Sequence, residues 1–199
     1  MSKYFIAFIA IMSVFSCKNK LQEPGTSTVE KTDSSIAAGF FPVTDFIGGE
    51  LKLVDSLKPP ITKEITVNDK KTLSGATDEE FKSYAQAFLH PDINDPAIKS
   101  FYKESSIADQ SIPSVTFLFT TTKDDLPLKT INVYVKPDPV LNDKVSGVYM
   151  EKQWIMNDTL FSQKLYWKTG HHFQITTEKT IQKKLLPKEQ VKFTWDPTE

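Results

Sequence analysis

The sequence predicts an α+β fold, in which an antiparallel meander of about five to seven strands carries the amino-terminal helices on one face. Two observations lead to this prediction. In two segments before residue 91, apolar residues recur with the spacing of amphipathic helices, whereas beyond residue 113 they alternate with polar residues, as in half-buried strands. Polar segments short enough for hairpin turns separate several of the alternating runs.

Three helices are expected in the amino-terminal part. The first lies in 40–57, and the clearest lies in 77–90, where Thr77 and Glu80 form a capping box and a proline follows the segment. The apolar face of this second helix comprises Phe81, Tyr84, Ala85, Phe88 and Leu89. The segment 95–102 predicts a third, short helix because a proline occupies its first position.

Alternation of apolar and polar residues predicts the strands. An early pair is expected in 61–69 and 71–75, joined by a turn at Asp69-Lys70. The later strands are expected in 114–122, 129–137, 144–156, 159–168 and 171–179. Asn157-Asp158 and Thr169-Gly170 predict hairpin turns between the last three of them. The final residues, 188–199, also alternate but are bracketed by prolines, so the sequence leaves open whether they add a strand.

The period of two also sorts the side chains of the central strands onto two faces. The face expected to form the core carries Val148, Met150, Trp154 and Met156 from one strand, and Phe161, Leu165 and Trp167 from the next. Tyr149 and Tyr166 lie on the opposite face, among polar neighbours. They are the candidate ligand-binding residues, as a platform for a sugar, a lipid or a partner protein. Isolated surface aromatics are the alternative interpretation.

The amino terminus has the composition of a signal peptide. Lys3 supplies a positive charge, and the twelve residues 4–15 are nearly all apolar. This run is shorter than the roughly 20 residues of a membrane-spanning helix but matches the apolar core of a secretory leader. We therefore expect residues 1–16 to be a signal peptide.

The four residues VFSC, 14–17, resemble the lipobox of bacterial lipoproteins. This resemblance implies cleavage before Cys17, the only cysteine of the chain, and attachment of lipid to its sulfur. Residues 17–39 would then be the lipidated cysteine and a disordered tether, because they are polar and lack apolar periodicity, and 40–199 a single domain. The expected location is the bacterial cell envelope, at the outer membrane facing the periplasm. The lipid makes the membrane a partner of the chain.

The domain also resembles small, uncharacterised envelope lipoproteins of Bacteroidota. The segments PVTDF at its start and YWK and HFQI near its end carry the likeness. This likeness implies no activity. The order of elements is similar to that of the lipoprotein-carrier proteins, whose curved antiparallel sheets are covered by helices, and this similarity concerns architecture alone.

Composition and the absence of known motifs argue against several functions. The net charge is −1 and no basic stripe with interleaved aromatics is present, so nucleic acid is not expected as a partner. All 24 basic residues are lysines, whereas phosphate and carboxylate recognition favours arginine. Walker, dinucleotide-binding and nucleophile-elbow motifs are absent from the sequence. We expect no cofactor.

The polar residues suited to catalysis are scattered. His171 and His172 are adjacent and would point to opposite faces of a strand, and the third histidine, His90, precedes a proline. We therefore expect no metal site. The acidic groups at 78–80, 92–95 and 124–125 fall at a helix start and in loops, where carboxylates commonly bind the local backbone.

These observations favour a lipid-anchored cell-envelope protein with a non-catalytic binding or scaffolding role. Its partner would be another envelope protein, or a hydrophobic or envelope ligand such as a lipid. One alternative is a hydrolase of envelope polymers that uses Asp and Glu carboxylates. A purely structural envelope component is the second alternative.

Overall fold

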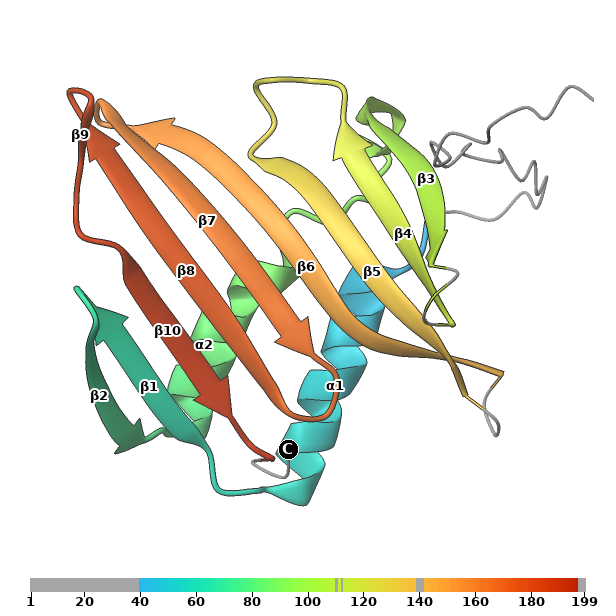
Figure 1. Ribbon diagram of the computed structural model, residues 1–199, viewed down its shortest axis with the longest axis horizontal. Helices are drawn as coiled ribbons and strands as arrows, with labels where there is room; N and C mark the ends of the chain where they lie inside the picture. Colours follow the sequence, from blue (N-terminus) through green and yellow to red (C-terminus); the bar gives the residue numbers. More distant parts are fainter. Residues whose placement is uncertain (1–39, 110, 112, 139–141, 197–199) are drawn as a thin grey trace, which may run out of the picture. The chain divides into compact units, whose positions relative to one another are not determined.

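The computed structural model describes residues 40–196, except for 110, 112 and 139–141. These residues form one ten-stranded antiparallel sheet and two α-helices (Figure 1). The α+β class is therefore confirmed, with more strands than expected. No helix of the described part has the length and apolar character needed to cross a membrane. The predicted signal peptide and the predicted lipid-attachment residue Cys17 lie outside the described residues.

The elements follow one another in chain order as α1 (Val43–Leu57), β1 (Thr62–Val67), β2 (Lys70–Gly75), α2 (Asp78–Leu89), a 3₁₀ turn (Lys99–Phe101), β3 (Tyr102–Asp109), β4 (Ser114–Thr121), β5 (Leu128–Asp138), β6 (Asn142–Met156), β7 (Thr159–Lys168), β8 (His172–Ile181), β9 (Lys184–Leu185) and β10 (Glu189–Thr194). The order across the sheet is β2-β1-β10-β8-β7-β6-β5-β4-β3, and β9 pairs with β8. The meander expected from the sequence corresponds to β4–β8, and β3 extends it by one strand at the edge of the sheet.

The structure overturns one expectation and adds two strands. Residues 95–102 do not form a short α-helix, because only a single 3₁₀ turn is present before β3 begins at Tyr102. β3 itself was not expected from the sequence. The final segment, which the sequence left open, forms β10, whose Val191 and Phe193 are buried between β1 and β8.

Two-residue turns with positive φ close three of the hairpins. Asn157 and Asp158 have φ of 49° and 55°, which confirms the predicted turn between β6 and β7. The turn between β1 and β2 lies at Asn68 and Asp69, one residue earlier than predicted. Such backbone angles match the right-handed twist of the flanking strands, and asparagine and aspartate adopt them more readily than most other residues.

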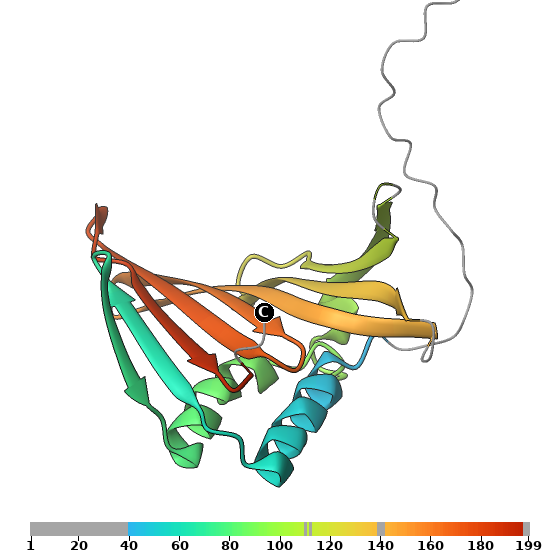
Figure 2. The ribbon, with the colours of Figure 1, turned by 60° about the horizontal axis from the view of Figure 1, so that its bottom comes forward.

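Both α-helices pack on the same face of the sheet, which we call the inner face (Figures 1 and 2). α2 starts with the predicted capping box, in which the Thr77 hydroxyl accepts a hydrogen bond of 3.2 Å from the Glu80 amide. The helices contribute Val43, Ile47, Val54, Phe81, Ala85 and Phe88 to the core. The opposite, outer face has no helix of the described part on it.

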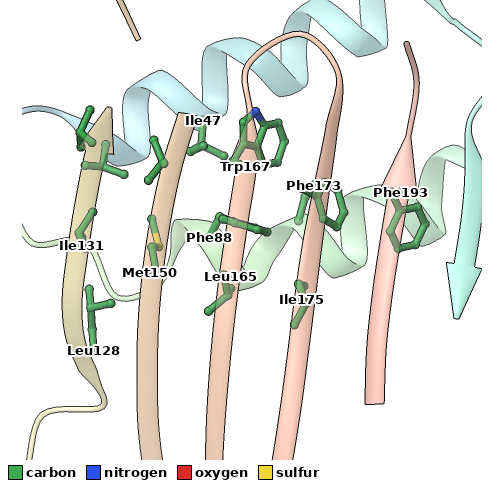
Figure 3. Close-up of a cluster of buried hydrophobic side chains, with 14 of the residues drawn as sticks. Ile47, Phe88, Leu128, Ile131, Met150, Leu165, Trp167, Phe173, Ile175 and Phe193 are labelled. Carbon is green, nitrogen blue, oxygen red and sulfur yellow. The ribbon is translucent and has the colours of Figure 1, made fainter. Parts of the chain in front are cut away.

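The centre of the core is a cluster of aromatic rings. Phe173 of β8 lies between Phe88 of α2 and the neighbouring strand residues Trp167 and Phe193 (Figure 3), with ring centroids 5.0 to 5.4 Å apart. The one polar atom of Trp167, its indole N–H, donates to the Glu50 carboxylate of α1 at 3.4 Å. Because aromatic side chains bury large areas, this cluster accounts for much of the attachment of the helices to the sheet.

Candidate functional site

A groove lies on the inner face where α2 ends. Both helices cover only one part of the long strands, and β6 and β7 continue past the last residue of α2, Leu89 (Figure 1). The groove has a volume of about 860 Å³, within the range of small-molecule sites. It is lined by Ala87, His90, Pro91, Asp92, Asn94, Asp95, Pro96, Pro127, Lys152, Trp154 and Gln163.

Lys152 forms the boundary between the core and the groove. Its side chain lies on the inner face of β6, two residues after the buried Met150, and the residue is only 8% exposed. The amine donates hydrogen bonds to the backbone carbonyls of Ala87 and His90 at the carboxyl end of α2. Burial lowers the pKa of Lys152 to about 8. The amine thus satisfies carbonyl groups that a helix end otherwise leaves unpaired.

Trp154 forms a rigid aromatic wall of the groove. Its ring stacks on Phe161 with the centroids 5.2 Å apart and the planes 2° from parallel. Lys179 lies 5.9 Å from the centroid of Phe161, so three side chains from β6, β7 and β8 form a row across the sheet. Trp154 lines the groove, whereas Phe161 does not.

The other side of Trp154 is open because β5 starts late. Leu128, the first residue of β5, pairs with Lys152, so no strand runs beside β6 at Trp154 on that side. Pro127 lies there instead, and its carbonyl accepts a hydrogen bond of 2.7 Å from the Gln153 amide. The start of β5 and the end of α2 together leave this part of the sheet uncovered.

The loop after α2 supplies the polar rim of the groove. The Asp92 carboxylate accepts a hydrogen bond of 2.9 Å from the Asn94 amide, and the Asp95 carboxylate accepts one of 2.9 Å from the Ala97 amide. Each carboxylate therefore caps its own turn, as the sequence pattern indicated. The Asn94 side-chain amide donates to the carbonyl of Phe41 at 3.4 Å, which ties the loop to the segment before α1.

Two of the acidic residues singled out at the start of α2 form ion pairs, and a third residue, in the loop before β5, accepts a hydrogen bond through its backbone. Asp78 and Glu80 in the first turn of α2 form ion pairs with Lys58 and Lys63. The loop residue Asp124 accepts a hydrogen bond of 2.5 Å from Lys129 through its backbone carbonyl. Within the described part of the chain, no three His, Cys, Asp or Glu side chains gather closely enough to hold a metal ion.

The three histidines lie in different places. His90 lines the groove at the end of α2, whereas His171 lies in the turn between β7 and β8, with Nδ1 4.0 Å from the Asp196 carboxylate. His172 packs against Tyr166 on the outer face, with ring centroids 6.0 Å apart. Burial, helped by the charge of Lys192, lowers the pKa of His172 to about 4, so this imidazole is neutral near pH 7.

The two predicted ligand-binding residues are neighbours on the outer face. Tyr149 of β6 and Tyr166 of β7 are directly opposite each other in the antiparallel register. Burial raises the pKa of both phenols. The Tyr149 hydroxyl donates a hydrogen bond of 2.5 Å to Glu151, which fixes the ring along the strand. Both side chains are half-buried.

Only Tyr166 of this pair lines a hollow on the outer face. The hollow has a volume of about 370 Å³ and is formed by Ser114, Tyr134, Lys136, Ser146 and Tyr166. Tyr149 is not among these residues, so the structure does not bring both tyrosines to one concavity. Their role as a binding platform stays a prediction.

Gly147 allows Tyr166 to lie flat against β6. A Cβ atom at this position would lie 2.8 Å from the backbone oxygen of Trp167 and 3.2 Å from the Tyr166 hydroxyl. We expect Gly147→Ala to lower the free energy of unfolding by about 1–3 kcal/mol, because a backbone atom cannot move away as a flexible side chain would. Urea denaturation measures this change. Gly48→Ala is the control, since a Cβ there meets nothing within 4 Å, and an equal loss in both variants would contradict the prediction.

Lys152 and the groove were not recognised in the sequence. The available signal was the series Val148, Met150, Lys152, Trp154 and Met156, in which a lysine interrupts an alternating apolar face. A lysine at such a position has to find acceptors for its amine if it is buried. The sequence did not indicate that the acceptors are carbonyls at the end of a helix.

Comparison of the chain with protein-family models, curated proteins and solved structures finds no match. The chemistry of the groove and of the outer face is therefore the basis on which a function can be argued.

Proposed function

We propose that this chain is a lipid-anchored protein of the bacterial cell envelope that binds a ligand without catalysis, in the groove beside Trp154. The expected location is the outer membrane, facing the periplasm. The observation that carries the binding role is a groove of about 860 Å³ with one wall made by a stacked, immobilised indole ring. Sites of this kind commonly combine a rigid aromatic surface with a few polar groups.

The arrangement of carboxylates favours binding over hydrolysis. Asp92 and Asp95 come from the same loop, and each is engaged by the backbone of its own turn. A glycosidase needs two carboxylates that flank the scissile bond, about 5–9 Å apart, one of them free to transfer a proton. The remaining polar side chains of the groove are amides, His90 and Lys152, and the Lys152 amine is already bound to two carbonyls.

Native mass spectrometry of the full-length chain, released gently from membranes, tests the binding role. We expect the wild type to retain a small molecule and the Trp154→Ala variant to lose it, because this change removes the aromatic wall of the groove. Ile155→Ala is the matched control, since it truncates the neighbouring, exposed side chain on the outer face of the same strand. A bare wild-type chain, or retention of the same mass by the Trp154→Ala variant, would count against the proposal.

The anchor is tested separately through Cys17. A Cys17→Ser variant is expected to lose the added lipid mass and to move from the membrane fraction to the soluble fraction, because the sulfur that carries the lipid is removed. Each buried methylene contributes about 0.8 kcal/mol, so the loss of two or more acyl chains abolishes stable attachment. Unchanged fractionation and unchanged intact mass would contradict the anchor.

A further inference from the structure

We infer that the ligand of the groove is a saccharide, with one uncharged pyranose ring stacked on Trp154 and its hydroxyl groups bound by the loop after α2. This inference rests on the proposed function and names the chemical class of its ligand. Three features of the groove support it: the aromatic wall, the hydrogen-bonding groups of the rim and the sign of the charge.

The wall offers a flat apolar surface of fixed orientation. Phe161 covers one side of the Trp154 ring in a parallel stack, and Lys179 lies over Phe161 in turn. The ring therefore cannot turn without breaking this stack. The C–H groups on one side of a pyranose form an apolar patch of similar size, and such a patch packs on the face of an indole.

The rim offers mainly acceptors. One oxygen of Asp92 and one of Asp95 bind the loop backbone, and in the described part of the chain the second oxygen of each receives no hydrogen bond. Gln163 also lines the groove. Its side-chain amide nitrogen donates to Thr177 at 3.1 Å, and its amide oxygen, which receives no hydrogen bond in the described part of the chain, remains an acceptor. Sugar hydroxyls are donors as well as acceptors, so they match this set.

Charge and polarity disfavour the other common envelope ligands. Asp92 and Asp95 carry two negative charges, whereas Lys152 supplies one positive charge that is already bound to the carbonyls of Ala87 and His90. A phosphate or carboxylate headgroup would be repelled by the two aspartates. An acyl chain would leave the rim oxygens desolvated and unpaired, which is unfavourable.

A direct test uses the full-length chain in micelles of a detergent without a sugar headgroup. The probes are trimers of α-linked glucose, of β-linked glucose and of β-linked N-acetylglucosamine, with a fluorescent fatty acid as the apolar competitor. In saturation-transfer NMR we expect at least one trimer to receive magnetisation at its ring C–H protons. Trp154→Ala should weaken its affinity about tenfold or more. Ile155→Ala, at an exposed residue on the outer face of the same strand, should leave it unchanged.

Each result has a distinct meaning. Binding of a trimer that depends on Trp154 supports the inference. Binding of the fatty acid alone, lost in the Trp154→Ala variant, overturns the saccharide while the proposed binding role stands. Binding of a trimer that is insensitive to Trp154→Ala places the ligand elsewhere and overturns the assignment of this groove. If neither probe binds and the native mass is bare, the saccharide and the proposed binding role both fail. Thermal unfolding shows whether each variant is folded. Trp154→Phe is a milder second substitution, to be used if Trp154→Ala does not fold.

Discussion

Replacing Phe173 by alanine is expected to lower the free energy of unfolding by about 3–5 kcal/mol. The side chain is fully buried, with 0% exposure. Its ring lies within 6.3 Å, centroid to centroid, of five other aromatic rings, those of Phe81, Phe88, Trp167, Phe193 and Trp195. Truncation leaves a cavity that these rings cannot fill, since they belong to two different strands, the segment after β10 and a helix.

Urea denaturation followed by circular dichroism measures this loss. Ile155→Ala on β6 is the control, because Ile155 is 74% exposed and its truncation is expected to change stability by no more than about 0.5 kcal/mol. A loss below about 1 kcal/mol for Phe173→Ala would mean that the helices are attached to the sheet elsewhere.

The elements with strong local signals were predictable from the sequence. The strand expected in 159–168 coincides with β7, and the capping box at Thr77 marks the start of α2. These signals are local, because alternation along a strand and caps at a helix end depend on residues only a few positions apart. The two faces of β6 and β7 were assigned correctly for the same reason, with Met150 and Leu165 inside and Tyr149 outside.

The elements that the sequence did not reveal depend on contacts over long distances along the chain. β3 is an edge strand whose residues after Tyr102 are all exposed, so it has no apolar alternation to recognise. β10 lies between β1 and β8, and this position follows from pairing with strands far apart in sequence. Alternation in 189–194 indicates a strand but not its neighbours.

The groove depends on such long-range features as well. Trp154 was expected on the core face, and it lies on that face, but it lines the groove at the end of α2 and is not part of the buried core. How far a helix extends across a sheet is determined by the length of the helix and by its packing, neither of which the sequence of β6 contains. The groove is formed by the end of α2, Pro127 and Trp154 together, and these lie far apart in the sequence.

Replacing Lys152 by methionine is expected to make stability lower and less dependent on pH. Methionine fills a similar volume but cannot donate to the carbonyls of Ala87 and His90, so we expect a loss of about 1–3 kcal/mol near neutral pH. The free energy of unfolding of the wild type also contains a contribution from Lys152 that depends on pH. The pKa of Lys152 is lowered to about 8 in the folded chain from 10.5, so between these pH values the unfolded state binds more protons than the folded state.

Stability therefore rises with pH wherever the unfolded state binds the additional proton. The burial of the charged amine is unfavourable below pH 8, and this penalty disappears as pH rises from about 8 to 10.5, because the neutral amine is then the common form in both states. The wild-type free energy of unfolding minus that of Lys152→Met should grow by about 2 kcal/mol over this interval.

Denaturation of both proteins at several pH values gives this difference directly, and the titration of tyrosines, common to both, cancels. Lys144→Met on the same strand is the control, since Lys144 is exposed and its replacement should change the free energy of unfolding by no more than about 0.5 kcal/mol. A flat difference for Lys152→Met would mean that the amine is not buried at the end of α2.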